Sequence, residues 1–371
     1  MKKRVVITGG HLTPALAVIE ELQKRQDWEI YFVGRRYAME GDKTPAVEAE
    51  IIPKKGIFFQ AIEAGRWQRR FTRYTLPSLL KVPRGFWQAW RFLRKVKPRI
   101  ILSFGSYVSV PVVVAGWWQR IPVVTHEQTT MRGLATKINT LFARKIAISW
   151  PRTGQYFPSS KLVITGNPVR QSCFKINEKL FAGLRFGKKR PFVLITGGSQ
   201  GSHQINQAIE QILPQLLQKA NILHQCGPSE IFGDFKGLDE ARKSLPSNLK
   251  KRYHLRRYLI EEEIGTFLNK ADLVISRAGA NVMTELIALG KPALLIPLPF
   301  LPEQKSNARL LVDLGMAESL VDQERIAEKV LAMTVKMLDN LSFYQKNALK
   351  SRSLVKKDAA RKIADLLEKI L

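Results

Sequence analysis

Short apolar segments rich in β-branched residues alternate with helical patterns along most of the chain. Strands that alternate with helices form parallel sheets, because each parallel connection needs a crossover. The pattern therefore predicts a doubly wound α/β fold. The apolar segments predict strands at 4–7, 29–33, 100–103, 122–125, 145–149, 162–165, 191–194, 221–225, 273–276 and 293–297, with helical periodicity between them, as at 260–269 and 282–289.

The alternation is interrupted between residues 166 and 190, where the chain becomes irregular and basic. A chain of 371 residues is long enough for two domains of roughly 100–200 residues each. We therefore expect one α/β domain over 1–166 and a second over 167–344. Residues 324–371 are helical in pattern without a strand, and a helix at about 345–371 is expected to return to the first domain.

The net charge of the chain indicates what kind of partner it binds. The chain holds 60 Lys and Arg against 31 Asp and Glu, a formal net charge of +29. Between Glu63 and Glu178 the only acid is Glu127, while basic residues crowd 66–99. A field of this sign favours a polyanionic partner, either nucleic acid or an anionic membrane surface.

Residues 83–95 form an amphipathic helical pattern dominated by aromatic and basic side chains. Phe86, Trp90 and Leu93 fall on one face at helical spacing, with basic residues opposite. Such a helix is typical of a membrane surface, although a core-facing helix with a solvated basic back has the same pattern. The basic-aromatic run at 66–71 and a later tryptophan pair favour the membrane. The candidate membrane residues are Phe86, Trp87, Trp90, Arg91, Lys95 and Trp117.

Several other classes of protein are poorly supported. No uninterrupted apolar run reaches the roughly 18 residues of a transmembrane helix, and the residues before Thr8 do not resemble a signal peptide. Cys173 and Cys226 have no short metal or redox spacing, which fits reduced thiols in a cytosolic protein. Clusters typical of metal sites are also lacking in the sequence. We therefore expect neither a metal nor another cofactor.

Two glycine turns are candidates for ligand binding. Gly197-Gly198-Ser199-Gln200-Gly201-Ser202 follows a predicted strand and precedes a helix, which favours an anion such as phosphate at the helix start. A tight turn without a ligand is the alternative. In the second turn, Gly9-Gly10-His11, the histidine is either a general base or a capping side chain. Thr13 is the expected N-cap there, with Pro14 as the first helical residue.

Three further polar segments follow predicted strands. His126-Glu127-Gln128 lies at the edge where open α/β sheets bind ligands, and Glu127 is either ion-paired or held for chemistry. Glu285 is expected in the first turn or so of a helix, either as a dipole-favourable acid or as an acceptor for two ribose hydroxyls. Residues 302–308 are expected to form a surface loop.

Taken in order, these motifs resemble the MurG family, cytoplasmic N-acetylglucosaminyltransferases that complete lipid II in bacterial cell-wall synthesis. The resemblance extends over essentially the whole chain. The motifs that carry it are Thr8-Gly9-Gly10-His11 with Pro14-Ala15-Leu16-Ala17, Tyr107-Val108-Ser109 with Pro111, His126-Glu127-Gln128, Gly166-Asn167-Pro168-Val169-Arg170, Gly197-Gly198-Ser199-Gln200-Gly201, Ser276-Arg277-Ala278-Gly279-Ala280, Glu285 and Gln304.

The resemblance implies a GT-B fold, in which two Rossmann-like domains with parallel sheets face across a cleft. It implies inverting transfer of N-acetylglucosamine from UDP-GlcNAc, held by the second domain, to lipid I, a polyprenyl-diphosphate-MurNAc-peptide held by the first. The protein would be peripheral to the cytoplasmic face of the cell membrane, on an anionic surface. The implied catalytic residues are His11 and Glu127. The implied substrate-binding residues are Gly9, Gly10, Thr129, Arg170, Ser199, Gln200, Leu259, Ala280, Asn281, Val282, Met283, Thr284, Glu285 and Gln304.

The chain departs from the family pattern in three places, all on the acceptor side. The turn at Gly9-Gly10-His11 is shorter than the family's Gly-Gly-Gly-Thr-Gly-Gly-His loop. Thr129 stands where the family generally has Asn, and Ser106 replaces a usual Gly before Tyr107.

Other functions share some of these features. Another UDP-sugar-dependent transferase with a lipid acceptor such as diacylglycerol would have the same donor motifs and membrane face, and a UDP-sugar epimerase is a more distant alternative. A basic nucleic-acid-binding protein would explain the net charge, but it leaves Glu285 and the glycine turns unexplained. We therefore expect no nucleic-acid partner.

Overall fold

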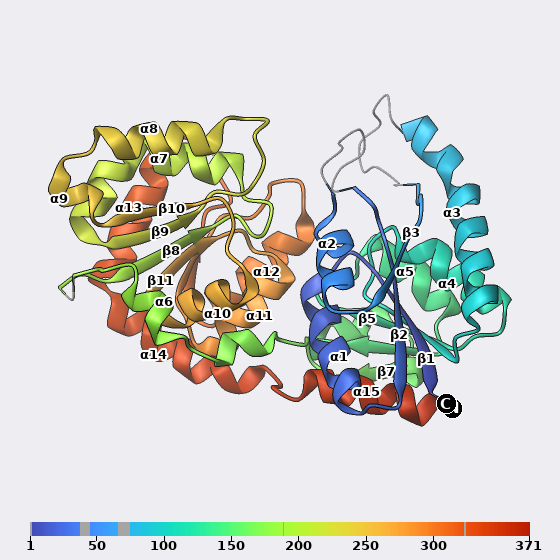
Figure 1. Cartoon of the computed structure of the whole chain (residues 1–371). Helices are drawn as coiled ribbons and strands as arrows, with labels where there is room; N and C mark the ends of the chain where they lie inside the picture. The colour runs from blue at the N-terminus through green and yellow to red at the C-terminus, as the bar shows by residue number, and fades with distance from the viewer. Residues whose placement is uncertain (1, 38–44, 66–74, 188, 323) are drawn as a thin grey trace. The chain divides into compact units, whose positions relative to one another are not determined.

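The computed structural model describes residues 2–37, 45–65, 75–187, 189–322 and 324–371 (Figure 1). The chain divides into two compact units. Unit 1 comprises Met1–Pro168 together with Lys356–Leu371, and unit 2 comprises Val169–Val355. Among the described residues, no helix is both long enough and apolar enough to span a membrane.

Unit 1 is built on a seven-stranded parallel sheet with the order β3-β2-β1-β4-β5-β6-β7. Its strands are β1 (Lys3–Thr8), β2 (Trp28–Gly34), β3 (Phe58–Ala61), β4 (Ile100–Ser103), β5 (Val123–Glu127), β6 (Lys145–Ile148) and β7 (Leu162–Ile164). Its α-helices are α1 (Leu12–Lys24), α2 (Val47–Lys54), α3 (Thr75–Val96), α4 (Ser109–Trp118), α5 (Leu134–Phe142) and α15 (Ala359–Ile370).

Side chains alternate between the two faces of this sheet, so that each strand contributes to two cores. One core lies between the sheet and α1, α2 and α15, and it includes Val5, Ile7 and Ile363. The other lies between the sheet and α3 and α4, and it includes Val6 and Leu93. Burial on both faces explains why the central strands are continuous apolar runs in the sequence.

Unit 2 is built on a six-stranded parallel sheet with the order β10-β9-β8-β11-β12-β13. Its strands are β8 (Phe192–Thr196), β9 (Asn221–Gln225), β10 (Tyr253–Arg256), β11 (Leu273–Ser276), β12 (Ala293–Leu295) and β13 (Ala317–Ser319). Its α-helices are α6 (Glu178–Ala182), α7 (His203–Lys219), α8 (Asp234–Ser244), α9 (Ser247–Lys250), α10 (Glu261–Lys270), α11 (Ala280–Leu289), α12 (Pro302–Asp313), α13 (Ile326–Asp339) and α14 (Leu341–Ser351).

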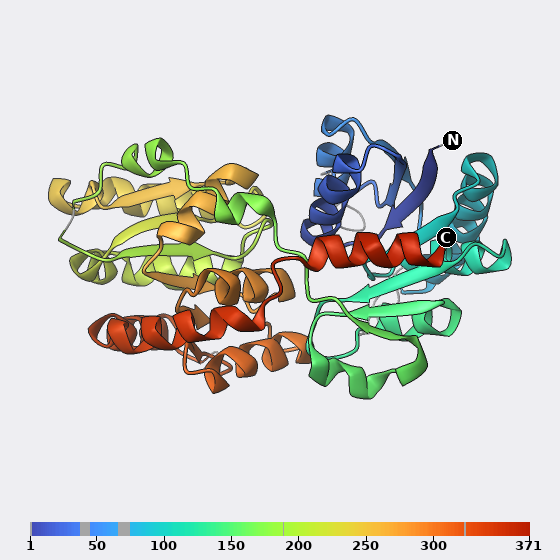
Figure 2. The same ribbon diagram turned by 90° about the horizontal axis from the view of Figure 1, so that it is seen from below.

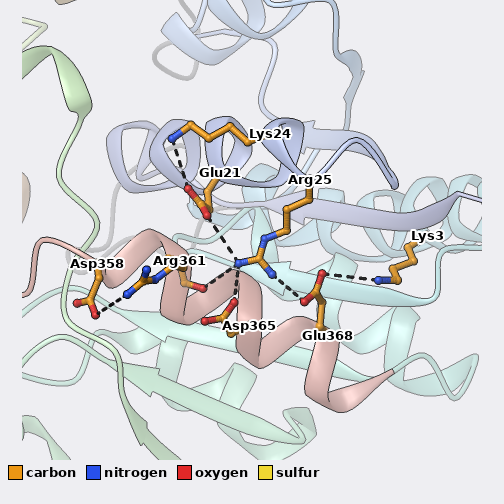
Figure 3. A network of polar contacts seen from close by, with 8 residues as sticks. All are labelled: Lys3, Glu21, Lys24, Arg25, Asp358, Arg361, Asp365 and Glu368. Atoms are coloured by element: carbon orange, nitrogen blue, oxygen red, sulfur yellow. Dashed lines mark hydrogen bonds and ion pairs between the residues drawn. The ribbon is translucent and has the colours of Figure 1, made fainter.

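The helix expected at about 345–371 is divided between the two units. α14 belongs to unit 2 and α15 to unit 1, and the chain passes from one unit to the other between Val355 and Lys356. Helix α15 lies beside α1 (Figures 1 and 2). Arg25, at the end of α1, contacts Asp365 at 2.5 Å and Glu368 at 2.8 Å, so ion pairs reinforce the apolar contact (Figure 3).

The strands expected from the sequence are all present, with ends shifted by up to two residues. Three further strands, β3, β10 and β13, were not predicted. Each lies at an edge of its sheet and is only three or four residues long, so it carries little apolar signal. Residues 302–308 were expected as a loop but begin α12, with Pro302 at the first helical position, where a missing amide costs nothing.

Candidate functional site

The glycine turn after β8 packs backbone to backbone against the turn after β9. Gly201 has a φ of +75°, and a Cβ on it would lie 2.0 Å from the Cys226 carbonyl oxygen, so only glycine fits. Ser202 caps α7, and its Oγ accepts a hydrogen bond from the Ile205 amide at 3.4 Å. Ser199 and Gln200 are exposed just ahead of the helix. The first amides of α7 and two exposed polar side chains thus lie together, an arrangement suited to an anion.

Arg170 and Glu285 form an ion pair inside unit 2. Arg170 Nε donates to Glu285 Oε1 at 2.7 Å, and the two side chains are 20% and 2% exposed. Burial acts to lower the pKa of Arg170, but the Glu285 carboxylate outweighs it, and the pKa is raised. Glu285 lies in the second turn of α11, so its expected place in the first turn, and the dipole reading that went with it, are wrong. The acid is instead held by an arginine.

The residues at the start of α11 have different surroundings. Met283 and Thr284 are buried, and Thr284 Oγ1 donates to the Ala280 carbonyl oxygen at 2.8 Å. Asn281 has a buried Oδ1 for which no hydrogen-bond partner is found among the described residues. Val282 is partly exposed. Only part of this predicted group therefore presents side chains outward.

Two more residues predicted to bind the sugar-nucleotide donor follow the carboxyl ends of strands, Leu259 in a connection and Gln304 in the first turn of α12. Leu259 is buried in the connection between β10 and α10. Gln304 Oε1 accepts a hydrogen bond from the Leu298 amide at 3.0 Å, which folds the segment between β12 and α12. Arg277, which is outside the predicted set of binding residues, donates to the Ile296 carbonyl oxygen at 2.9 Å, and burial lowers its pKa to about 10.

A buried polar network behind the glycine turn was missed by sequence reasoning. Asn206 Nδ2 donates to Asp234 Oδ2 at 2.7 Å and to the Cys226 carbonyl oxygen at 2.9 Å. His203 Nδ1 lies 2.5 Å from Asp234 Oδ1, and His224 Nε2 lies 3.1 Å from Asn206 Oδ1. The network ties β9, α7 and α8 together. A polar Asn on the apolar face of α7 was the signal that could have revealed it.

In unit 1, His11 occupies the N-cap of α1 and makes no side-chain capping hydrogen bond. The helix therefore starts earlier than expected, and Thr13 and Pro14 lie inside it. Proline is tolerated there because the first amides of a helix have no intrahelical partner. A Cβ on Gly10 would lie 2.7 Å from Ser106 Oγ, so the first glycine turn is in close contact with the turn after β4.

Glu127 ends β5, and its carboxylate is occupied by the loop that follows. Oε1 accepts hydrogen bonds from the Thr129 amide at 3.1 Å and the Thr129 hydroxyl at 2.9 Å. Oε2 accepts one from the Gly133 amide at 3.0 Å, and the residue is 2% exposed. Thr129, a predicted substrate-binding residue, thus donates its amide and hydroxyl to Glu127. The geometry therefore gives Glu127 a role in fixing the loop 128–133.

His126 is fully buried and uncharged. Its Nε2 lies 3.0 Å from the Gly166 carbonyl oxygen, and its Nδ1 lies 3.2 Å from Gln128 Nε2, which assigns the proton to Nε2. Burial lowers the pKa of His126 to about 4, the Gly166 carbonyl opposes this, and the charge of His11 lowers it further. Burial also lowers the pKa of His224 in unit 2 to about 3.

Both units are therefore expected to lose stability in mild acid. The folded pKa of each histidine lies below its unfolded value of about 6.5, so the unfolded chain binds more protons, and stability present above pH 6.5 is lost as the pH falls toward 4. Between pH 7 and pH 5 the loss is about 2 kcal/mol for each histidine. Urea midpoints should fall from pH 7 to pH 5. In His126→Gln the urea midpoint of unit 1 should depend less steeply on pH. An equally steep profile in His126→Gln would contradict the assignment.

The predicted membrane face on α3 is partly a core face. Leu93 is fully buried in the core, and Phe86 and Trp90 are partly buried against it. Packing against the sheet accounts for the apolar spacing of this stripe, and a membrane contact of α3 stays a prediction. Trp87 is 55% exposed, with the Arg91 guanidinium 5.5 Å from its ring centroid, and Lys95 is also exposed. The run at 66–71 lies outside the described residues.

Exposed apolar groups gather instead at the ends of α4 and α5. Trp117 is 51% exposed with its ring 5.2 Å from that of Phe142, and Leu141 is 72% exposed. These residues line a groove of about 500 Å³ together with Arg120 and Arg144. The groove combines an apolar floor with positive charge. It lies at the amino end of β5, whereas Glu127 lies at the carboxyl end of the same strand.

Known proteins match the chain over its full length. Residues 6–148 match the glycosyltransferase family 28 N-terminal domain, and residues 192–367 match the glycosyltransferase family 28 C-terminal domain. The UDP-N-acetylglucosamine–N-acetylmuramyl-(pentapeptide) pyrophosphoryl-undecaprenol N-acetylglucosamine transferase 2 of Bacillus cereus is 36% identical over 94% of this chain and 95% of its own. The UDP-N-acetylglucosamine–N-acetylmuramyl-(pentapeptide) pyrophosphoryl-undecaprenol N-acetylglucosamine transferase of Clostridium tetani is 33% identical over 100% of this chain and 98% of its own.

Solved structures give the same result. The crystal structure of Acinetobacter baumannii MurG has a TM-score of 0.71 at 25% identity, and it covers 99% of both chains. A UDP-GlcNAc 2-epimerase from Neisseria meningitidis has a TM-score of 0.70 at 16% identity over 100% of both chains, which shows a shared fold alone. The two parallel-sheet units are those of the GT-B fold. The chain belongs to glycosyltransferase family 28, within the MurG family of N-acetylglucosamine transferases.

Proposed function

We propose that the protein transfers N-acetylglucosamine from UDP-GlcNAc to a polyprenyl-diphosphate-linked MurNAc-peptide, with inversion at the anomeric carbon. The observation that carries this proposal is the full-length similarity to transferases named for that reaction. The buried Arg170–Glu285 pair and the glycine turn before α7 support it, since a UDP-sugar needs both an acceptor for ribose hydroxyls and a site for its diphosphate.

On the donor side, the amides of α7 with Ser199 and Gln200 hold the diphosphate. Glu285 accepts hydrogen bonds from the ribose, and Arg170 positions the Glu285 carboxylate. The segment around Leu259 borders the uracil, and the start of α11 with Gln304 borders the sugar. As the bond to the donor breaks, negative charge grows on UDP, and fixed amides at a helix start stabilise it.

On the acceptor side, His11 takes the proton from the attacking hydroxyl. It is a partly buried imidazole at the start of α1, and its side chain makes no capping hydrogen bond. Glu127 is less suited to this role because three hydrogen bonds from its own loop occupy its carboxylate. Gly9 and Gly10 allow the acceptor diphosphate to approach the backbone.

The test is transfer of radiolabelled N-acetylglucosamine from UDP-GlcNAc to lipid I in vesicles. Labelled disaccharide-lipid is expected, and UDP-GlcNAc is expected to raise the melting temperature. Label in a diacylglycerol lipid instead would favour the second type of transferase. Salt-sensitive DNA binding without any effect of UDP-GlcNAc would overturn the transferase proposal.

We also propose that the protein docks on an anionic membrane through the groove at the ends of α4 and α5. The test replaces Trp117 and Leu141 of the groove, together with Trp118 next to Trp117, which is 69% exposed, with serine. This triple variant is expected to bind vesicles that contain phosphatidylglycerol about tenfold more weakly, because serine buries less apolar area in lipid. Co-sedimentation measures the change. Phe343→Ser, at an exposed site on α14, is the matched control. Unchanged binding of the triple variant would place the contact elsewhere.

A further inference from the structure

The turn between β4 and α4 holds a serine in a conformation that favours glycine. Gly105 and Ser106 have φ values of +72° and +68°. Among the described residues, five other non-glycine residues have positive φ: Gln26, Lys97, Arg120 and Arg185 follow the ends of helices, where such a residue commonly ends the helix, and Arg325 is the N-cap of α13. Ser106 follows a strand. A side chain is therefore retained where the backbone alone would select glycine.

Neighbouring groups fix this conformation from several sides. Ser106 O accepts hydrogen bonds from the Ser109 amide at 3.0 Å and the Ser109 hydroxyl at 2.8 Å. The Gly105 amide donates to Ser103 Oγ at 3.2 Å, and Ser103 Oγ also accepts from Asn139 Nδ2 at 3.0 Å. These contacts hold the backbone of the turn and make no use of the Ser106 hydroxyl.

The Ser106 side chain lies over the first glycine turn. A Cβ placed on Gly10 would come within 2.7 Å of Ser106 Oγ and 2.8 Å of Ser106 Cβ. The Gly10 amide also donates to the Gly105 carbonyl oxygen at 3.3 Å, so the two turns are joined. Within the described ranges the Ser106 hydroxyl has no hydrogen-bond partner, and the residue is only partly buried. A hydroxyl donor is thus presented beside Gly10, the residue before His11, at the carboxyl edge of the sheet.

We propose that Ser106 is an acceptor-binding residue, with its hydroxyl donating a hydrogen bond to a diphosphate oxygen of the acceptor substrate. The inference rests on the proposed function, because it needs an acceptor that carries a diphosphate. The Ser106 hydroxyl supplies a hydrogen-bond donor over the Gly9-Gly10 turn that a glycine at position 106 would lack. A hydrogen bond to a charged oxygen is among the stronger ones, which makes its removal measurable.

Two substitutions separate binding from backbone strain. Ser106→Ala removes the hydroxyl and keeps the strain, whereas Ser106→Gly removes both. Each is expected to raise KM for lipid I about tenfold, with KM for UDP-GlcNAc unchanged. Ser106→Gly is also expected to raise the melting temperature of unit 1 by about 2–4 °C, because strain is relieved. A more stable enzyme with weaker acceptor use is a result that a purely structural role cannot produce.

Controls make the outcome decisive. Ser160→Ala, at an exposed serine of unit 1, should change neither KM. Ser106→Asn should restore part of the acceptor affinity, because Asn tolerates a positive φ and carries an N–H donor. An unchanged KM for lipid I in Ser106→Ala, or equal shifts for both substrates, overturns the inference. Absence of transfer by the wild-type protein would instead overturn the proposed function.

Discussion

Glu285→Ala is expected to destabilise unit 2 by about 3–5 kcal/mol and to abolish the rise in melting temperature caused by UDP-GlcNAc. In the wild-type protein the Arg170 guanidinium lies 2.7 Å from the Glu285 carboxylate. The substitution removes this carboxylate and leaves the guanidinium largely buried without it. Breaking a buried pair from one side costs far more than the pair contributes, because the remaining charge has lost its water as well as its partner. Urea unfolding with and without UDP-GlcNAc measures both effects.

A pair of exposed charges provides the comparison. Lys236 and Glu240 lie on one face of α8 at 4.0 Å, with side chains 84% and 64% exposed. Glu240→Ala should change the free energy of unfolding by no more than about 0.5 kcal/mol. If Glu285→Ala behaves like Glu240→Ala, the Arg170–Glu285 contact is not the anchor of the donor site.

His11→Ala is expected to lower kcat by about 100- to 10,000-fold with little change in stability. The proton of the acceptor hydroxyl then has no positioned base, while the start of α1 loses no capping hydrogen bond from this side chain. Single-turnover transfer with saturating UDP-GlcNAc and lipid I measures the chemical step, and thermal unfolding measures the stability.

Glu127→Ala should give the reverse result. It deprives the Thr129 and Gly133 amides of their acceptor, and each buried amide left unsatisfied costs about 1–3 kcal/mol. The melting temperature should therefore fall, and activity at low temperature should fall less than in His11→Ala. A stable Glu127→Ala protein with a kcat as low as that of His11→Ala would assign the base to Glu127.

The sequence was most informative where residues are buried on both sides. The central strands are continuous apolar runs, and their order along the chain predicts the parallel sheets. The polar residues that follow them could be placed at the ligand-binding edge for the same reason. Edge strands such as β13 bury less and were missed.

Contacts between distant residues could not be predicted from periodicity. Arg170 and Glu285 are 115 positions apart, and nothing local in either segment indicates that one holds the other. The amphipathic pattern around Trp90 is a different case. It correctly indicates an apolar face, but a face turned to the sheet and a face turned to lipid have the same helical spacing. Only the packing of α3 distinguishes them.

The return of α15 has a consequence for the order of folding. Ile363, Ala364 and Leu367 complete the core beneath α1, and Arg25 fastens the helix there. All of unit 2 is synthesised before α15, so unit 2 has its full set of residues on the ribosome while unit 1 still lacks part of its core. Unit 1, whose synthesis begins first, is thus the last to receive all of its core residues. Until then the apolar side chains that α15 covers stay exposed to water, and to chaperones that bind such surfaces.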